Sequence, residues 1–464
     1  MKREFVQAIF CAPTGAYEDK PYPSRLTDDV FKALAEAGIN RIFGFGYDGR
    51  KETIEKTFEL CEKYGIFYFP TPASAEDYVR ILQGKNGEKT FNELTEAEKK
   101  ELDGRFVKEL EGYAKHRSFG GVFFSDEAGY LAAEGIASAK KVFDKHYGEY
   151  EFHTNFYSYS IDDKIFWGGM GGMAPEKLPF ALTGDMEIRF ENRFRYYDCL
   201  VENLLSKAPF EYVSQDKYPY EMFWPTVPTS VHVALFELTA YFNEKKKKYG
   251  SKFYNYMQVG NWGSDKREIT FADMALQMHV TAAYGSEGFA YFPGCFPLDF
   301  VSEPSFAGSR GGLGALIDID GNPTIYCDYV RKLNTFFHQI EDDILNSELL
   351  GVNAYGTYDN GFTEDEIKEL PDNECIFRGK LPDRLLYDSN LPVKSSNEVL
   401  LSVFQREEKK RFYLVNLSTV FRNDVKIELP EGQYELIGLE GKREIPSRAD
   451  LFLGAGCGVY IREL

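Results

Sequence analysis

Histidine and cysteine are sparse in this chain, and their placement excludes the usual metal and disulfide patterns. Among 464 residues there are six histidines, without an HExxH motif or any other ligand spacing. The seven cysteines, an odd number, stand singly from Cys11 to Cys457. This pattern predicts reduced, mostly buried thiols in a cytoplasmic protein rather than a disulfide framework. We therefore expect no metal site.

Long apolar runs and clusters of positive charge are also missing. No stretch approaches the roughly 20 apolar residues of a membrane span, and Met1 to Phe10 lacks the apolar core of a signal peptide. The formal net charge of −19 repels phosphate groups, so neither nucleic acid nor an anionic membrane is expected as a partner. The oligomeric state stays open, a homo-oligomer included.

Motifs for nucleophilic and cofactor chemistry are absent as well. There is no G-x-S-x-G, and no Cys or Lys stands in a context that marks a nucleophile or a Schiff base. Gly44–Gly49 spells G-x-G-x-x-G, but the next strand ends at Phe69-Pro70 without the acid that a dinucleotide site requires. Gly168–Gly172 lacks a following GK[ST] and a preceding strand. No cofactor is expected, and carboxylate chemistry becomes the main candidate.

What the chain does contain is an alternation of strand and helix patterns. The expected strands are Phe5–Phe10, Asn40–Phe45, Ile66–Phe69, a run at Val122, Tyr150–Tyr157, Tyr212–Gln215, Phe253–Val259 and Phe289–Phe292. Helical segments separate them, among them one capped by Thr27, Lys51–Tyr64, Thr95–His116, Leu131–His146, Thr229–Lys247 and Thr270–Tyr284, and Tyr326–Leu345 closes the set. Eight strands alternating with helices predict a (β/α)8 TIM barrel over residues 1–348.

Beyond about residue 349 the helices disappear. Val399–Phe404, Arg411–Asn416, Val425–Leu429 and Val459–Arg462 have the composition of strands joined by turns. We expect a small C-terminal all-β sandwich domain over residues 349–464 that packs against the barrel.

Two adjacent acids end the fourth expected strand. The decapeptide Gly120–Gly129, G-G-V-F-F-S-D-E-A-G, places Asp126 and Glu127 directly after a buried apolar run. Parallel α/β folds deliver catalytic groups at this end of their strands. Since neighbouring residues of a strand point to opposite faces, only one of the two is expected to look straight into a pocket. A solvated helix start is the plain alternative.

Polar and aromatic residues follow the other expected strands. Carboxylates, amides and aromatic rings on one rim suit a carbohydrate, and aromatic residues make up 16% of the chain. Besides Asp126 and Glu127, the candidates for catalysis or sugar binding are Tyr47, Asp48, Asn155, Tyr157, Trp167, Asp216, Tyr218, Trp224, Gln258, Asn261, Trp262 and Phe292.

One of these segments has a family resemblance. Glu211–Tyr220, E-Y-V-S-Q-D-K-Y-P-Y, resembles the sixth strand of family 42 β-galactosidases, in clan A of the retaining glycoside hydrolases. The downstream order is similar too, with Asn261-Trp262, then A-A-Y-G-S-E-G-F-A-Y-F-P at Ala282–Pro293 and I-D-I-D-G-N-P-T at Ile317–Thr324. The resemblance implies a barrel glycosidase whose acid/base Glu ends the fourth strand and whose nucleophilic Glu ends the seventh.

The chain departs from that pattern at two positions. Glu127 matches the acid/base, but Asp126 stands where the clan has Asn, and Gln258 stands where the nucleophile should be. The Asp-Glu pair is similar to that of substrate-assisted β-N-acetylhexosaminidases, which implies that Asp126 orients a 2-acetamido group acting as the nucleophile. In a second reading Asp216 supplies the missing base or nucleophile. Inverting pairs stand about 6.5–9.5 Å apart and retaining pairs about 5–5.5 Å.

The sequence thus predicts a glycoside hydrolase that cleaves an oligosaccharide or glycoconjugate, with Glu127 as general acid/base and Asp126 assisting. Two alternatives stay open: an inactive barrel that only binds carbohydrate, which the amide of Gln258 favours, and a barrel enzyme of other chemistry, such as a lyase.

Overall fold

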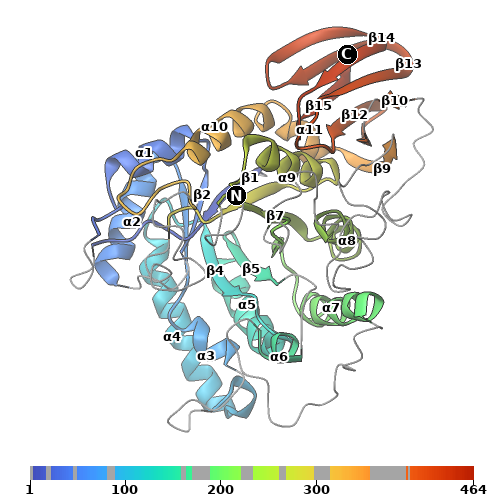
Figure 1. Cartoon of the computed structure of the whole chain (residues 1–464). Coiled ribbons are helices and arrows are strands. Elements are labelled where there is room, and N and C mark those ends of the chain that lie inside the picture. Colours follow the sequence, from blue (N-terminus) through green and yellow to red (C-terminus); the bar gives the residue numbers. More distant parts are fainter. Residues whose placement is uncertain are drawn as a thin grey trace.

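The computed structural model describes residues 4–16, 22–44, 50–80, 89–157, 163–169, 189–220, 234–260, 268–296, 314–355, 393–395 and 398–464. Its N-terminal part is a barrel of eight parallel strands (Figure 1). The strands are β1 (Val6–Phe10), β2 (Arg41–Gly44), β3 (Phe67–Pro70), β4 (Gly121–Asp126), β5 (Glu151–Phe156), β6 (Tyr212–Asp216), β7 (Lys252–Gln258) and β8 (Gly288–Phe292).

The eight strands lie in the order β3-β2-β1-β8-β7-β6-β5-β4. The seam between β3 and β4 is closed by backbone hydrogen bonds on both sides of one residue. Tyr68 donates to the carbonyl of Ser118 over 2.7 Å, and Gly120 donates to the carbonyl of Tyr68 over 3.1 Å. Because the sheet closes on itself, the carboxyl ends of all its strands meet on one rim.

Helices surround the barrel, and all except Asp163–Gly168 overlap helical segments that the pattern predicted. They are α1 (Asp28–Glu36), α2 (Lys51–Tyr64), α3 (Ala75–Val79), α4 (Glu96–Ala114), α5 (Ala133–Tyr147), α6 (Asp163–Gly168), α7 (Arg189–Leu205), α8 (Ala234–Tyr249), α9 (Phe271–Ala283), α10 (Ile325–Phe337) and α11 (Glu341–Asn346). Single 3-10 turns occur at Phe91–Glu93 and Tyr130–Ala132. The side chains of Thr27, Thr95 and Thr270 cap α1, α4 and α9. The predicted closing helix is divided in two between Phe337 and Glu341.

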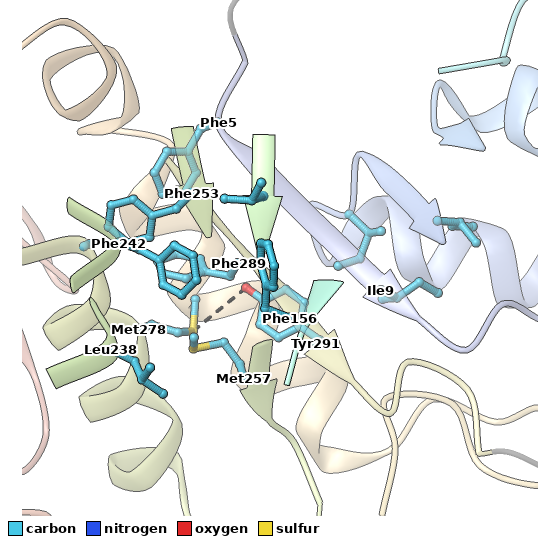
Figure 2. Packing of buried hydrophobic residues seen from close by; sticks show 14 of the residues in the cluster. Phe5, Ile9, Phe156, Leu238, Phe242, Phe253, Met257, Met278, Phe289 and Tyr291 are labelled. Atoms are coloured by element: carbon cyan, nitrogen blue, oxygen red, sulfur yellow. Dashed lines mark hydrogen bonds between the residues drawn. The ribbon is translucent and has the colours of Figure 1, made fainter. Parts of the chain in front are cut away.

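The main core fills the layer between the strands and the helices. Figure 2 shows its β7–β8 sector, where Phe242 of α8 packs against Phe253 with ring centroids 6.2 Å apart and the hydroxyl of Tyr291 meets the sulfur of Met278 of α9. Inside the barrel a separate aromatic cluster forms the packing, including Phe10, Phe43, Phe69, Phe123, Tyr254 and Tyr256. Most of the chain's many aromatic rings in these regions are therefore structural.

The C-terminal part is an antiparallel β domain. Its strands are β9 (Glu348–Tyr355), β10 (Val393–Ser395), β11 (Val399–Arg406), β12 (Lys409–Asn416), β13 (Asn423–Gly438), β14 (Gly441–Leu453) and β15 (Gly458–Glu463). They lie in the order β10-β13-β15-β12-β11-β9, and β14 pairs with β13. The predicted fold class, a (β/α)8 barrel with a C-terminal all-β domain, is confirmed. The domain boundary at residue 348 stays a prediction.

The β domain packs on the barrel through α9. Every residue of α9 from Asp273 to Ala283 is buried, because β7 lies on one side and β12 on the other. His279 Nδ1 and the hydroxyl of Tyr413 form a hydrogen bond of 2.6 Å across this contact. Arg411 Nε lies 3.4 Å from an oxygen of Asp343 on α11. These buried polar contacts fix how the two parts are joined.

Candidate active site

A bulge in β4 decides which of its two terminal acids faces the barrel interior. Phe123 pairs with His153, yet Asp126 pairs with Asn155, so three residue steps along β4 match two along β5. The rings of Phe123 and His153 meet inside the barrel with centroids 5.5 Å apart. Simple alternation from Phe123 would turn Glu127 inward. The extra residue turns Asp126 inward instead, beside Asn155.

Glu127 leaves the path of the strand immediately afterwards. Its φ of +48° lies in the left-handed region, which costs a non-glycine residue roughly 1–3 kcal/mol and is concentrated at functional sites. Its backbone N–H donates to the carbonyl of Asn155 over 3.0 Å. Its side chain forms a hydrogen bond with Asp216 at the end of β6. The strained backbone thus brings Glu127 sideways to the next acid on the rim.

The loop after Glu127 is held by α6. Gly129 approaches this helix so closely that a Cβ there would lie 2.4 Å from the backbone nitrogen of Gly169. Tyr130 packs on Phe166 and Trp167, with ring centroids 5.3 and 5.5 Å away. Because Trp167 is fully buried in this contact, its ring supports the loop. We leave Trp167 out of the proposed sugar-binding set.

Asn155 stands between the two aspartates. Its Nδ2 donates to Oδ1 of Asp126 over 3.0 Å, and its side chain also forms a hydrogen bond with Asp216. Its Oδ1 accepts the hydroxyl of Ser214 over 2.7 Å. The amide therefore presents its donor group to two carboxyls that would otherwise repel each other. Asp126, Glu127, Asp216 and Asn155 form one connected polar group, which we call the carboxyl cluster.

Burial shifts the acidity of this cluster. It raises the pKa of Asp126 to about 7, the charge of Asp216 adds to the rise, and the hydrogen bond from Asn155 opposes it. Burial also raises the pKa of Asp216, against the hydrogen bond with Glu127 and smaller opposing contributions. Desolvation and like charge both disfavour the ionised form. Both aspartates therefore keep their protons to a higher pH than free carboxyls do.

Aromatic side chains line the same end of the barrel. Phe10 lies 5.5 Å from Tyr256 and 5.7 Å from Phe292 between ring centroids, and Tyr218 lies 5.5 Å from Phe292. The Tyr256 hydroxyl feels the charges of Asp126 and Asp216, and burial raises its pKa well above the usual value. Two of the predicted residues, Tyr218 and Phe292, are thereby placed together at this end of the barrel.

Gln258, at the end of β7, is engaged with the backbone. It is 1% exposed, its Oε1 accepts the N–H of Tyr220 over 2.9 Å, and its Nε2 donates to the carbonyl of Gly260 over 3.5 Å. Both contacts require an amide with one donor and one acceptor. This accounts for Gln at a position where the family resemblance implies a nucleophilic Glu.

The remaining predicted residues divide into two groups. Tyr157 follows β5 directly and is half-buried. Five others lie outside the described residues: Tyr47, Asp48, Trp224, Asn261 and Trp262. The sequence interpretation missed Ser214, His153 and Tyr256, which share inward faces with Asp216, Asn155 and Tyr254 on β6, β5 and β7. Their spacing of two residues was the available signal.

The described ranges contain no group of three or more His, Cys, Asp and Glu side chains arranged to hold a metal ion. Within the same ranges, none of the helices has the length and apolar character needed to cross a membrane.

Neither a protein-family model nor a curated protein sequence matches this chain. Solved structures do match its fold. Eubacterium rectale Amy13B aligns at 8% identity and a TM-score of 0.53, over 100% of this chain and 96% of that one. A family 39 glycoside hydrolase from the gut symbiont Bacteroides cellulosilyticus WH2 aligns at 11% and 0.49, over 100% and 81%. A β-galactosidase from the psychrophilic Marinomonas ef1 aligns at 9% and 0.46, over 73% and 61%.

At these identities the likeness is one of fold. The Eubacterium match extends over nearly the whole of both chains, so the barrel and the β domain together form a known arrangement. This chain spans less than two thirds of the Marinomonas protein. The resemblance to family 42 β-galactosidases stays a prediction.

Proposed function

We propose that this protein is a glycoside hydrolase that cleaves a glycosidic bond of an oligosaccharide or glycoconjugate. Glu127 is the general acid/base, and Asp126 assists it. The observation that carries the proposal is the hydrogen bond between Glu127 and Asp216 at the carboxyl ends of β4 and β6. This is the rim on which barrel enzymes place their catalytic groups.

A hydrogen bond between two carboxyl groups requires a proton on one of them. The raised pKa values of Asp126 and Asp216 supply the condition for keeping that proton near neutral pH. In a coupled group of this kind the proton belongs to the cluster rather than to one residue. A retained proton next to ionised carboxyls is what general acid catalysis of glycoside cleavage needs.

The geometry favours a nucleophile that comes from the substrate. Glu127 and Asp216 are in hydrogen-bond contact, so their carboxyls are closer than the roughly 5–5.5 Å of a retaining pair. Gln258 is an amide and cannot form a glycosyl ester. A 2-acetamido group on the sugar fills the missing role without another protein carboxylate.

The proposed reaction has two steps. Glu127 gives its proton to the leaving oxygen while the acetamido carbonyl oxygen attacks C1, which breaks the glycosidic bond and forms a cyclic oxazolinium. Asp126 accepts the acetamido N–H and stabilises the positive charge that develops there. Water then attacks C1 and releases its proton to Glu127, which restores both the acetamido group and the acid. Tyr218 and Phe292 offer aromatic surface to the sugar.

A panel of aryl glycosides tests the proposal, with matched sugars that carry or lack a 2-acetamido group. We expect turnover only on the acetamido sugars, with inhibition by a thiazoline mimic of the cyclic intermediate. We expect Glu127→Gln to lose turnover of substrates with poor leaving groups by roughly 10²-fold or more, and to retain more on activated ones. Asp126→Asn should lose activity on both.

The other outcomes are equally informative. Turnover of plain galactosides that depends on Asp216 would overturn substrate assistance and favour a second protein carboxylate. Calorimetric binding of sugars without turnover would support an inactive carbohydrate-binding barrel. If the protein neither binds nor turns over any sugar of the panel, the proposed function is contradicted.

A further inference from the structure

The carboxyl cluster is connected to the interior of the barrel by a chain of hydrogen bonds. Asp126 accepts from Asn155 over 3.0 Å, Asn155 accepts from Ser214 over 2.7 Å, and Ser214 lies 2.9 Å from Nε2 of His153. Asn155 is 2% exposed, and Ser214 and His153 are fully buried. This chain of hydrogen bonds therefore runs through a region from which water is excluded.

The direction of each hydrogen bond follows from the number of protons available. The Ser214 hydroxyl has one proton and donates it to Asn155, so His153 Nε2 must be the donor to Ser214. Burial and the charge of Arg41 hold the pKa of His153 well below its usual range, so the ring is neutral. Its Nδ1 is then an acceptor, and the hydroxyl of Tyr254 lies within reach of both ring nitrogens, 3.0 Å from Nδ1 and 2.9 Å from Nε2.

The hydrogen-bond chain ends at His153, whose ring is held rigidly. The imidazole of His153 packs against Phe43 and Tyr254, each with its ring centroid 5.0 Å away and nearly parallel, and these two rings also contact each other with centroids 6.2 Å apart. Below it, Arg41 and Glu151 form a buried ion pair, and an oxygen of Glu151 lies 3.7 Å from His153 Nδ1. The ring therefore cannot rotate without breaking aromatic contacts, which fixes where its donor points.

At its other end, the hydrogen-bond chain fixes the orientation of the Asn155 amide. Because Oδ1 of Asn155 is occupied by Ser214, its Nδ2 and both N–H protons face Asp126 and Asp216. A flipped amide would put its oxygen against two acids and leave Ser214 facing a second donor. The hydrogen bonds from Asn155 oppose the rise in the pKa of both aspartates. The amide orientation that makes these bonds thus depends on Ser214 and His153, which do not form hydrogen bonds with the aspartates themselves.

We propose that His153 and Ser214 are positioning residues of the carboxyl cluster. Through Asn155 they hold Asp126 and Asp216 on one amide and set how many protons the cluster carries near neutral pH. Their catalytic significance rests on the proposed glycoside hydrolase function. The titratable and charged groups that face these hydrogen-bonded residues and the cluster are Cys11, Arg41, Glu127, Glu151, Tyr197, Tyr212, Lys217, Tyr254 and Tyr256.

The test compares Ser214→Ala with Ser214→Thr, which keeps the hydroxyl, and with Ser286→Ala. Ser286 is also fully buried and hydrogen-bonded, but it lies at the opposite end of the barrel strands. The first readout is the pH dependence of kcat/KM on an aryl 2-acetamido glycoside. We expect Ser214→Ala to lower kcat roughly tenfold with little change in KM, and to move both limbs of the profile to higher pH by about one unit.

The second readout does not depend on turnover. Carbon-13 labelling of the aspartate carboxyls, with the Asp126 and Asp216 signals assigned from Asp126→Asn and Asp216→Asn, follows the two titrations directly. We expect both to move upward in Ser214→Ala, to return in Ser214→Thr, and to stay unchanged in Ser286→Ala.

His153→Phe keeps an aromatic ring in place and removes the donor to Ser214 together with the nitrogen facing the Tyr254 hydroxyl, so it should shift the titrations in the same direction by a smaller amount. A folded Ser214→Ala protein whose Asp126 and Asp216 titrate as in the wild type would overturn the inference, whatever the outcome with glycosides. A protein that turns over no glycoside but shows the shifts would contradict the proposed function alone.

Discussion

The side-chain oxygen of Gln258 accepts the backbone N–H of Tyr220, 38 residues earlier in the chain, over 2.9 Å. The same amide donates to the carbonyl of Gly260, and its own backbone is bound on both sides by Gln277. The residue at the expected nucleophile position is therefore a connector between β7 and the segment after β6. An amide with both contacts made is not a damaged nucleophile.

The first prediction concerns Gln258→Glu, which restores the carboxylate implied by the family resemblance. We expect no gain in turnover and a loss of about 1–3 kcal/mol in the free energy of unfolding, because the introduced carboxyl has no proton for Gly260. The loss should be larger at pH 8 than at pH 5, where a protonated carboxyl can imitate the amide. Urea unfolding and the aryl glycoside assay measure both. Increased hydrolysis would show that only the carboxylate was missing.

The carboxyl ends of the barrel strands show how much of the candidate site could be predicted from the sequence. Alternating patterns predicted eight strands, and since parallel strands of a closed barrel end on one rim, Asn155, Asp216, Tyr218 and Phe292 were expected on the rim that carries Glu127. The structure places them there, while their roles at a substrate stay predictions. Local residue patterns carry this much because strand direction and spacing are local properties.

Other features depend on contacts that no local pattern contains. The bulge in β4 exists only relative to β5, so the inward turn of Asp126 could not be deduced from the decapeptide alone. Trp167 was predicted to bind a sugar, and its side chain is fully buried. Amino-acid composition does not distinguish an aromatic ring that stacks on a sugar from one that packs in a core. The role of Gln258 depends on Tyr220, a partner set by the tertiary fold.

The second prediction concerns the pH dependence of stability. Burial raises the pKa of Asp126 from 3.8 to about 7, so between these pH values the folded protein holds a proton that the unfolded chain has released. The free energy of unfolding should therefore fall as pH rises from about 4 to 7. Asp126→Asn removes this dependence. Its stability relative to wild type should grow by at most about 4 kcal/mol over that range, and by less where solvent screens the half-buried side chain.

Glu398 in the β domain provides the matched control. It is 4% exposed, its Oε2 has no hydrogen-bond partner within the described ranges, and burial raises its pKa to about 8. Glu398→Gln should show the same sign of stability gain on raising the pH, measured by urea unfolding between pH 4 and 8. It should leave the pH profile of turnover unchanged. If the two variants alter turnover alike, the effect of Asp126→Asn is only one of stability.

The third prediction concerns the contact between the barrel and the β domain. Tyr413→Phe removes the hydroxyl that forms the 2.6 Å hydrogen bond with Nδ1 of the buried His279. Since His279 Nε2 already has no partner in the described part of the chain, the ring would lose its one polar contact there. We expect a loss of about 1–3 kcal/mol in the free energy of unfolding. Tyr434→Phe, whose part-buried hydroxyl donates to Pro430, should cost less. Equal costs would argue against a special role for this contact.

The fourth prediction concerns the hydroxyl of Tyr256, which is buried beside Asp126 and Asp216. It has no hydrogen-bond partner among the described residues, and the side chain is 1% exposed. Removing an unpaired buried hydroxyl should be neutral or stabilising, and the ring contact with Phe10 remains in Tyr256→Phe. Unpaired polar groups persist in folded proteins where they have a function, and a proton donor facing two carboxyls is suited to a substrate oxygen.

We therefore expect Tyr256→Phe to keep or raise the free energy of unfolding while kcat/KM falls by roughly tenfold or more, since one hydrogen bond to a reacting group contributes about that much. Urea unfolding and aryl glycoside kinetics on the same preparation separate the two effects. Tyr291→Phe is the matched control, because its buried hydroxyl is bonded to Asn334 on the outer side of β8. It should lose stability and keep turnover. The opposite pattern, with Tyr256→Phe less stable and equally active, would mean that the hydroxyl holds the fold and does not act on a substrate.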